Sequence, residues 1–177
     1  MTTLTNSIPQ NSPLKFLTAH PAHIFAQGFG AGLAPKAPGT FGTLVAFPLF
    51  WMIAHLSMGS KLAIISALFL VGIYMCSVTG KALGVADHKS IVWDEIVGMM
   101  FVLTFTPPHW VFWLAAFALF RLFDIWKPFP IRQFDRKLKN GFGVMFDDLL
   151  AALFATICLF VATVWLISPH PDLHLPF

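Results

Sequence analysis

Charged residues are scarce in this sequence: Asp, Glu, Lys and Arg together make up 11% of its 177 residues. A soluble domain carries about 25% charged residues, so this chain has too little polar surface to cover a water-soluble globule. Cysteines are scarce too, and Cys76 and Cys158 each lie inside an apolar run without a Cys or His partner at ligand spacing. This excludes a Cys/His metal site, and we expect both thiols to be buried packing residues.

Several catalytic signatures are also missing from the sequence. No Ser-His-Asp or Cys-His arrangement can be recognised, and there is no DxDx(T/V) phospho-aspartate motif. The glycine-rich stretch from Gly28 to Thr43 lacks the GK[ST] of a Walker A loop. Chemistry through a covalent enzyme intermediate therefore has no obvious nucleophile, which favours water activated by a metal ion.

Apolar and aromatic side chains are abundant: 57% of the residues are hydrophobic, and there are 20 Phe and 6 Trp. This composition is typical of a lipid-facing surface with aromatic anchors at the interface. The apolar runs predict five spans, at about 44–58, 62–79, 96–106, 109–123 and 149–167. The predicted fold class is therefore all-α, a polytopic membrane helical bundle.

The third and fourth spans are short and meet at Pro107-Pro108, which predicts a helical hairpin. The stretch from Gly28 to Thr43 has too many Gly and Pro residues for a regular helix, so we expect a Gly/Pro-rich cytoplasmic loop there. The domain boundaries that follow are an N-terminal tail with a candidate interfacial helix (1–27), a membrane-embedded domain (28–168) and a C-terminal tail (169–177).

The basic residues partition unevenly between the two sides of the five predicted spans. One side receives segments 1–43, 80–95 and 121–148, and the other receives 58–61, 106–109 and 168–177. The first side holds all the Lys and Arg residues except Lys61: Lys15, Lys36, Lys81, Lys89, Arg121, Lys127, Arg132, Arg136, Lys137 and Lys139. This excess marks the first side as cytoplasmic, so we interpret the net charge of +3 as a topology signal and predict no nucleic-acid binding.

The acidic residues follow the same partition, although the positive-inside tendency does not require it. Only Asp172 falls on the outer side, and the cytoplasmic side receives Asp87, Asp94, Glu95, Asp124, Asp135, Asp147 and Asp148. Two adjacent pairs, Asp94–Glu95 and Asp147–Asp148, are predicted to begin the third and the last span. The dipole of a helix N-terminus favours an acid by about 0.3–1 kcal/mol, which explains one acid well and two adjacent acids poorly.

A divalent metal ion would explain these carboxylates. Hard cations such as Mg²⁺ take oxygen ligands, often one or two carboxylates together with substrate phosphate and water. The metal's charge would also offset the mutual repulsion of the acids. The sequence therefore predicts a Mg²⁺ site formed by Asp94, Glu95, Asp124, Asp147 and Asp148.

The bases near these acids predict a phosphate site. Arg121 lies three residues before Asp124 and shares a helix face with it. Arg as a planar fork and Lys as a point charge suit phosphate, and the predicted phosphate-binding residues are Lys36, Arg121, Lys127 and Arg132. The alternative is that these bases serve only as positive-inside anchors.

Proton transfer needs a group that titrates near neutrality. His88 is a candidate because histidine titrates near neutrality. Its neighbour Asp87 is the alternative candidate for proton transfer. The predicted catalytic residues are Asp87, His88, Asp94 and Glu95.

Four stretches of the chain together carry a family resemblance. In order they are GFGAGLAPKAPGTFGTLVA, DHKSIVWDEIVGM, FRLFDIWKPFPIRQFDR and GFGVMFDDLLAA, and they span Gly28 to Ala152. With these motifs the sequence resembles the phosphatidylglycerophosphatase A family of bacterial membrane lipid phosphatases.

The resemblance implies a magnesium-dependent hydrolysis of phosphatidylglycerophosphate to phosphatidylglycerol and phosphate, a step of phospholipid biosynthesis. It also implies a phospholipid substrate and a multi-pass location in the bacterial inner membrane, with the active site facing the cytoplasm. The alternative function is a membrane transporter or channel with an interfacial cation site, although its acids are expected along a pathway across the bilayer. The oligomeric state is left open.

Overall fold

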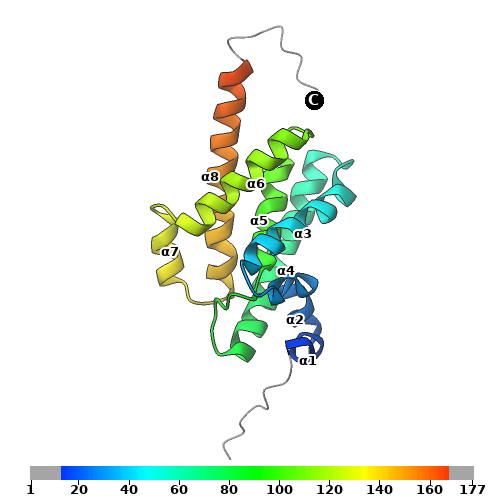
Figure 1. Cartoon of the computed structure of the whole chain (residues 1–177), viewed down its shortest axis with the longest axis vertical. Coiled ribbons are helices and arrows are strands. Elements are labelled where there is room, and N and C mark those ends of the chain that lie inside the picture. Colours follow the sequence, from blue (N-terminus) through cyan, green and yellow to red (C-terminus); the bar gives the residue numbers. More distant parts are fainter. Residues whose placement is uncertain (1–12, 168–177) are drawn as a thin grey trace, which may run out of the picture.

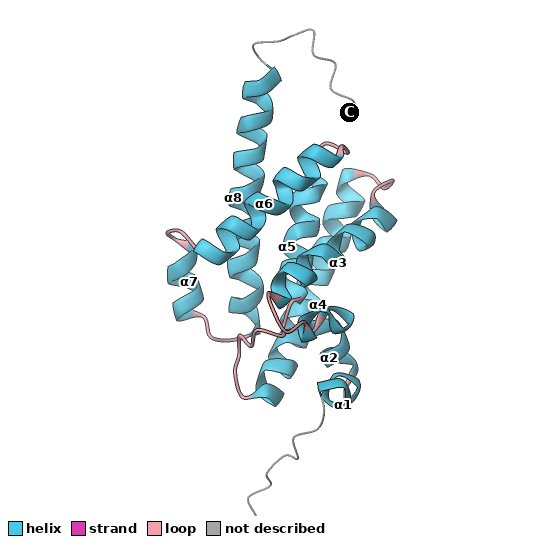
Figure 2. Cartoon of the chain, in the orientation of Figure 1, coloured by secondary structure: helices cyan, strands magenta, loops and turns pink. Residues whose placement is uncertain are grey.

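The structure, a computed structural model, describes residues 13–167, and within that range it contains helices and no strand. The prediction of an all-helical fold is confirmed (Figure 2). Residues 1–12 and 168–177 lie outside the described residues; they include the start of the N-terminal tail predicted at 1–27 and all of the C-terminal tail predicted at 169–177. The helices are α1 (Pro13–Thr18), α2 (Pro21–Ala26), the 3₁₀-helix η1 (Gly28–Leu33), α3 (Pro38–Ile53), α4 (Met58–Leu83), α5 (Trp93–Thr104), α6 (Trp110–Trp126), α7 (Ile131–Lys137) and α8 (Gly141–Ile167).

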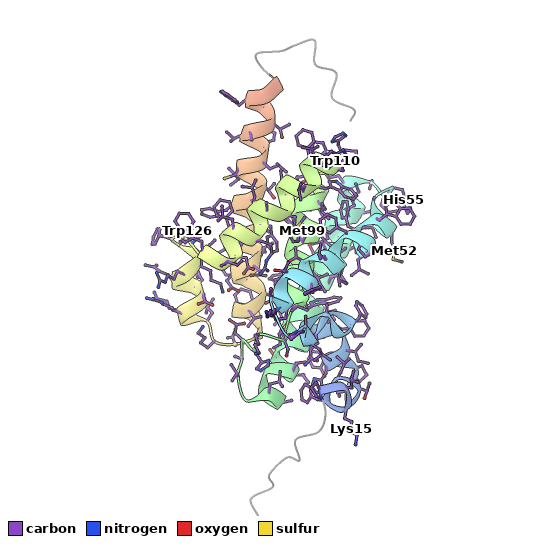
Figure 3. All side chains as sticks on the ribbon, in the orientation of Figure 1. Lys15, Met52, His55, Met99, Trp110 and Trp126 are labelled. Carbon is purple, nitrogen blue, oxygen red and sulfur yellow. The ribbon has the colours of Figure 1, made fainter. Side chains whose placement is uncertain are left out.

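The shortest of the large helices, α5, lies at the centre of the bundle (Figure 1). It contacts α3, α4, α6 and α8, and ten of its twelve residues are buried. Met99, in the middle of α5, is completely buried and lies at the centre of Figure 3. Every face of α5 is therefore covered by another helix.

Small residues allow the other helices to approach α5 closely. A Cβ atom on Gly98 of α5 would lie 2.9 Å from the ring of Phe120 on α6. A Cβ atom on Gly72 of α4 would lie 2.7 Å from Trp93 at the start of α5 and from Met145 on α8. Glycines at such crossings let the helix backbones approach, as they do in membrane helix bundles.

Two helices, α4 and α8, are long and apolar enough to cross a membrane. Only 28% and 44% of their most apolar windows are buried inside the protein, whereas the core helix of a soluble protein would be mostly covered. Their outward residues include Leu70, Tyr74, Phe160 and Trp165, which are 61–73% exposed. These features are compatible with a membrane protein; five crossings and a hairpin at Pro107-Pro108 stay predictions.

Several boundaries differ from the predicted ones. Helix α3 begins at Pro38, so the last six residues of the Gly/Pro-rich stretch are helical rather than irregular. Pro38 occupies the first helical position, where the fixed φ of proline favours a helix and its missing N–H costs nothing. Cys158 also differs from the prediction, because it is exposed on α8 whereas Cys76 is buried.

Helix α8 begins at Gly141, six residues before Asp147. The side chain of Asn140 accepts a hydrogen bond from the backbone N–H of Gly143 at 2.9 Å and so caps this earlier start. Asp147 and Asp148 therefore lie in the second turn of α8 and do not cap it, which corrects the prediction that they begin the last span.

The charged segments gather at one end of the bundle. Helices α1 and α2, the connection from α4 to α5, and the start of α8 lie in the lower half of Figure 1, with Lys15 at the bottom of Figure 3. The turns after α3 and α5 and the end of α8 lie in the upper half. The fold therefore brings segments far apart in the sequence to the end of α5 that carries Asp94 and Glu95.

Candidate active site

Two carboxylates occupy the first turn of α5. The backbone N–H of Val92, just before this helix, donates to the carbonyl of Ala26 at 2.8 Å, which ties the start of α5 to α2. Asp94 is 7% exposed, and the side chain of Glu95 is 13% exposed. Because the free N–H groups of a helix N-terminus favour negative charge, this position accommodates acids better than the middle of a helix does.

A third carboxylate reaches the same place from α8. Asp148 is 3% exposed, and its oxygen lies within 4.8 Å of oxygens from Asp94 and Glu95. We call Asp94, Glu95 and Asp148 the carboxylate cluster. It brings together three of the five predicted metal ligands, from two helices, although Glu95 and Asp148 are more than fifty residues apart in sequence.

The carboxylate cluster has unsatisfied oxygens. Asp94 Oδ1, Glu95 Oε2 and Asp148 Oδ2 are buried and have no hydrogen-bond partner among residues 13–167. A buried polar atom without a partner costs about 1–3 kcal/mol, and three such atoms in one group of like charges are unfavourable together. Carboxylate oxygens are the ligands that hard divalent cations prefer, so this set of donors fits Mg²⁺.

Arg121 and Asp124 lie beside the carboxylate cluster on α6. Arg121 Nη1 is 2.5 Å from Asp124 Oδ2 and 3.6 Å from Glu95 Oε1, which confirms that Arg121 and Asp124 share a face. Arg121 thereby links Asp124 to Glu95 of the carboxylate cluster. The Nε atom of Arg121 is buried and has no partner in the described part of the chain, so this guanidinium has capacity left for an anion.

The start of α3 covers the carboxylate cluster from the other side. A Cβ atom on Gly39 would collide with Glu95 Oε1 and would lie 3.0 Å from Arg121 Nη1. Thr43, one turn later, donates from its hydroxyl to the carbonyl of Gly39 at 2.8 Å and accepts from Arg121 Nη1 at 3.5 Å. Both residues lie in the predicted Gly/Pro-rich loop, and the sequence prediction did not connect either with Glu95 or Arg121. The G-T-F-G pattern carries no signal of these distant neighbours.

We expect Gly39→Ala to reduce the hydrolysis expected from the sequence roughly 10- to 100-fold, because the added methyl displaces Glu95 and Arg121, and small misplacements of a site are costly. The measurement is the steady-state rate on a phosphomonoester substrate. Gly59→Ala is the matched control, since nothing lies within 4 Å of a Cβ there and alanine favours a helix by roughly 0.5–1 kcal/mol. Equal rates for the two variants would contradict the close contact at Gly39.

Lys127 and Asp147 form a separate group with Asp135. The ammonium of Lys127, just after α6, pairs with Asp147 and lies 2.9 Å from Asp135 Oδ1 on α7. Burial alone would lower the pKa of Lys127, but Asp147 and Asp135 outweigh it and hold this pKa above its ordinary value. Asp147 therefore lies outside the carboxylate cluster, because successive residues on a helix point about 100° apart.

The remaining predicted residues lie away from the carboxylate cluster. Lys36, Asp87 and Arg132 are exposed, and Arg132 lies on α7. His88 is half-buried, and its Nδ1 accepts a hydrogen bond from the backbone N–H of Ser90 at 3.2 Å. The Oγ of Ser90 lies 2.8 Å from the same nitrogen.

Comparisons with known proteins agree on one family. The family model described as Phosphatidylglycerophosphatase A matches residues 24–163. The chain is similar to the phosphatidylglycerophosphatase A of Haemophilus influenzae, with 49% identity over 162 residues that cover 89% of this chain and 99% of that protein. It is also similar to the phosphatidylglycerophosphatase A of Escherichia coli, with 42% identity over 83% of this chain and 87% of that protein. No solved structure matches.

Proposed function

This chain belongs to the phosphatidylglycerophosphatase A family and is a phosphatase, and we propose that it hydrolyses the terminal phosphate of phosphatidylglycerophosphate with the help of Mg²⁺. Water attacks the phosphorus, the bond from phosphorus to the glycerol oxygen breaks, and phosphatidylglycerol and phosphate are released. The observation that carries the proposal is the carboxylate cluster with its unsatisfied buried oxygens.

Asp94, Glu95 and Asp148 would hold the metal ion, with Asp124 linked to Glu95 through Arg121. Mg²⁺ supplies Lewis-acid chemistry there: it offsets charge on the phosphoryl oxygens and makes a water molecule more acidic. Asp147 was predicted as a further ligand. Its pairing with Lys127 favours a role in anchoring the end of α6 and α7 to α8.

Arg121 is the base best placed to neutralise the phosphate. Its guanidinium is oriented by Asp124 and Glu95, and a fixed guanidinium stabilises developing charge without reorganising during the reaction. Lys36 and Arg132 are exposed and stay predicted phosphate-binding residues. The ammonium group of Lys127 already pairs with Asp147 and Asp135. Lys127 therefore attracts the phosphate electrostatically from a distance and does not bind it directly.

The leaving glycerol oxygen needs a proton. Asp87 and His88 stay the predicted donors, and both lie away from the carboxylate cluster. Because Nδ1 of His88 accepts the N–H of Ser90, the proton of the neutral ring lies on Nε2. Nε2 is therefore the atom from which His88 donates.

The placement of the charges supports action at the cytoplasmic face of the bacterial inner membrane. The segments rich in Lys and Arg gather at the end of the bundle where α5 begins, and an excess of these residues marks cytoplasmic segments. A lipid phosphomonoester would present its headgroup at that level, with its acyl chains along the apolar outer faces of the helices.

Metal removal tests the proposal directly. We expect the purified chain to release phosphate from phosphatidylglycerophosphate in mixed micelles, to lose this activity in EDTA, and to regain it when Mg²⁺ is restored. The measurement is inorganic phosphate released over time. Undiminished release in EDTA would contradict the metal site. No release at all, with cation flux through reconstituted vesicles, would instead favour a transporter or channel.

A further inference from the structure

A basic hollow lies on the outer side of the α6–α7 corner, apart from the carboxylate cluster. It has a volume of about 940 Å³ and is bordered by Leu122, Ile125, Trp126, Lys127, Arg132, Asp135 and Arg136. Asp135, the one acid in this border, pairs with Lys127 and Lys139. A second hollow of about 400 Å³ is bordered by the same three basic residues and Trp126. The two hollows therefore share the same three cations and differ in their other lining residues.

Two of these cations have no acidic partner. Arg132 and Arg136 are exposed and form no salt bridge with any residue in 13–167, in contrast to Lys127. They are four residues apart on α7, so they lie one above the other on the same face. Like charges at this spacing destabilise a helix by about 0.2–0.5 kcal/mol. An anion held between the two guanidinium groups would remove this repulsion.

Large apolar side chains surround these guanidinium groups. Trp126 is 68% exposed, Ile125 is 71% exposed and Phe129 is 74% exposed. Figure 3 shows Trp126 at the α6–α7 corner, pointing away from the bundle. Indole rings and long apolar side chains next to Arg are typical of a surface at the level of lipid headgroups. A free inorganic anion would need the cations but not this apolar border.

The hollow is connected to the carboxylate cluster through Lys127. Lys127 borders the hollow and pairs with Asp147, the residue immediately before Asp148 of the cluster. Arg121, which contacts the cluster, lies on α6 one residue before Leu122, which borders the hollow. The hollow and the carboxylate cluster are therefore linked through α6 and α8, and a ligand in the hollow does not occupy the proposed reaction site.

We propose that this hollow binds the phosphodiester group of an anionic glycerophospholipid through Arg132 and Arg136, with the acyl chains along Ile125, Trp126 and Phe129. This proposal rests on the proposed function for its role: the substrate carries a phosphodiester and a terminal phosphomonoester, joined by a three-carbon glycerol. Binding the phosphodiester at α7 directs the phosphomonoester toward Arg121 and the carboxylate cluster.

The test is a binding measurement that does not need turnover. The full-length chain in neutral detergent is titrated with fluorescent phosphatidylglycerol and, separately, with phosphatidylcholine of the same acyl chains. We expect the wild-type chain to prefer phosphatidylglycerol, and R132Q/R136Q to lose roughly 10- to 30-fold of its affinity for that lipid, as two cations near an anionic headgroup would contribute. K137Q removes one positive charge from α7, as each single Arg variant does, at a residue that does not border the hollow, and it should retain the preference.

Each result has a defined meaning. A wild-type chain without the preference, or an equal preference in all three proteins, overturns the site. Full displacement of the lipid by millimolar inorganic phosphate assigns a free-anion site and overturns the lipid assignment. If the double variant does not accumulate, R132Q and R136Q separately carry the test, with smaller losses expected from each.

The proposed function fails in a different way. If the wild-type chain releases no phosphate from any lipid but still prefers phosphatidylglycerol, the hydrolytic role is wrong and the lipid site stands. If it does release phosphate, R132Q/R136Q should lose more efficiency on phosphatidylglycerophosphate than on glycerol 3-phosphate, which has no phosphodiester. Equal losses on the two substrates would contradict the proposed direction of the lipid.

Discussion

Glu95→Gln and Asp148→Asn are each expected to reduce phosphate release at least about 10³-fold, which corresponds to roughly 4 kcal/mol of lost transition-state stabilisation. Each change replaces the carboxylate of a proposed metal ligand by a neutral amide of the same shape. The fold should persist, because each variant removes one negative charge from a buried group of like charges. We expect the thermal unfolding temperature in EDTA to stay the same or to rise, while Mg²⁺ stabilises the variants less than the wild-type chain.

Asp135→Asn provides the matched control for these carboxylate changes. Asp135 is also an acid on the charged end of the bundle, but it pairs with Lys127 and Lys139 and lies outside the carboxylate cluster. A partly exposed ion pair contributes about 0–1 kcal/mol, so the rate should stay within a few-fold of the wild type. Full activity in Glu95→Gln or Asp148→Asn would end the assignment of the cluster as a metal site.

Arg121→Lys is expected to reduce kcat/KM about 10²-fold, the usual effect of losing one donor that stabilises developing charge. Lys keeps the positive charge next to Asp124 and Glu95 but lacks the planar fork, so it cannot orient a phosphate in the same way. Arg121→Met should lose activity at least as strongly. It should also lower the thermal unfolding temperature, since it leaves two largely buried carboxylates without their counter-charge.

The comparison of the two Arg121 variants separates catalysis from folding. A Lys variant that unfolds at the wild-type temperature but turns over slowly assigns Arg121 to the phosphate. A Lys variant with an unaltered rate would reduce Arg121 to a counter-ion for the acids. The unfolding temperature and the kcat/KM for phosphatidylglycerophosphate are therefore measured on the same preparations.

Much of the fold could be predicted because the signal is strong in single segments. Apolar runs of helical length identify α4 and α8 without any knowledge of their neighbours. The start of α3 could not be found in this way, because Gly and Pro usually interrupt helices. Here Gly39 and Gly42 are helical, and neighbouring side chains leave no room for a Cβ at either position. Glycine is therefore needed there for a tertiary reason that composition does not contain.

The candidate site was predictable in its residue types and less so in its groupings. The sequence placed Asp94, Glu95 and Asp148 together with Asp124 because acids were concentrated beyond what helix dipoles explain. It also joined Asp147 to that set, since neighbours in sequence were treated as neighbours in space. Once α8 begins at Gly141, the two adjacent aspartates face different partners, and the helix start depends on a cap by Asn140.

The central position of α5 limits how this enzyme can change. The first turn of α5 carries Asp94 and Glu95. The rest of this short helix is enclosed by α3, α4, α6 and α8, and Gly98 lies against Phe120 of α6. A larger side chain anywhere along α5 would tilt or shift this helix and so displace both carboxylates. Adaptation to other lipid headgroups should therefore arise at the outer corner formed by α7, where amino-acid substitutions leave the position of α5 unchanged.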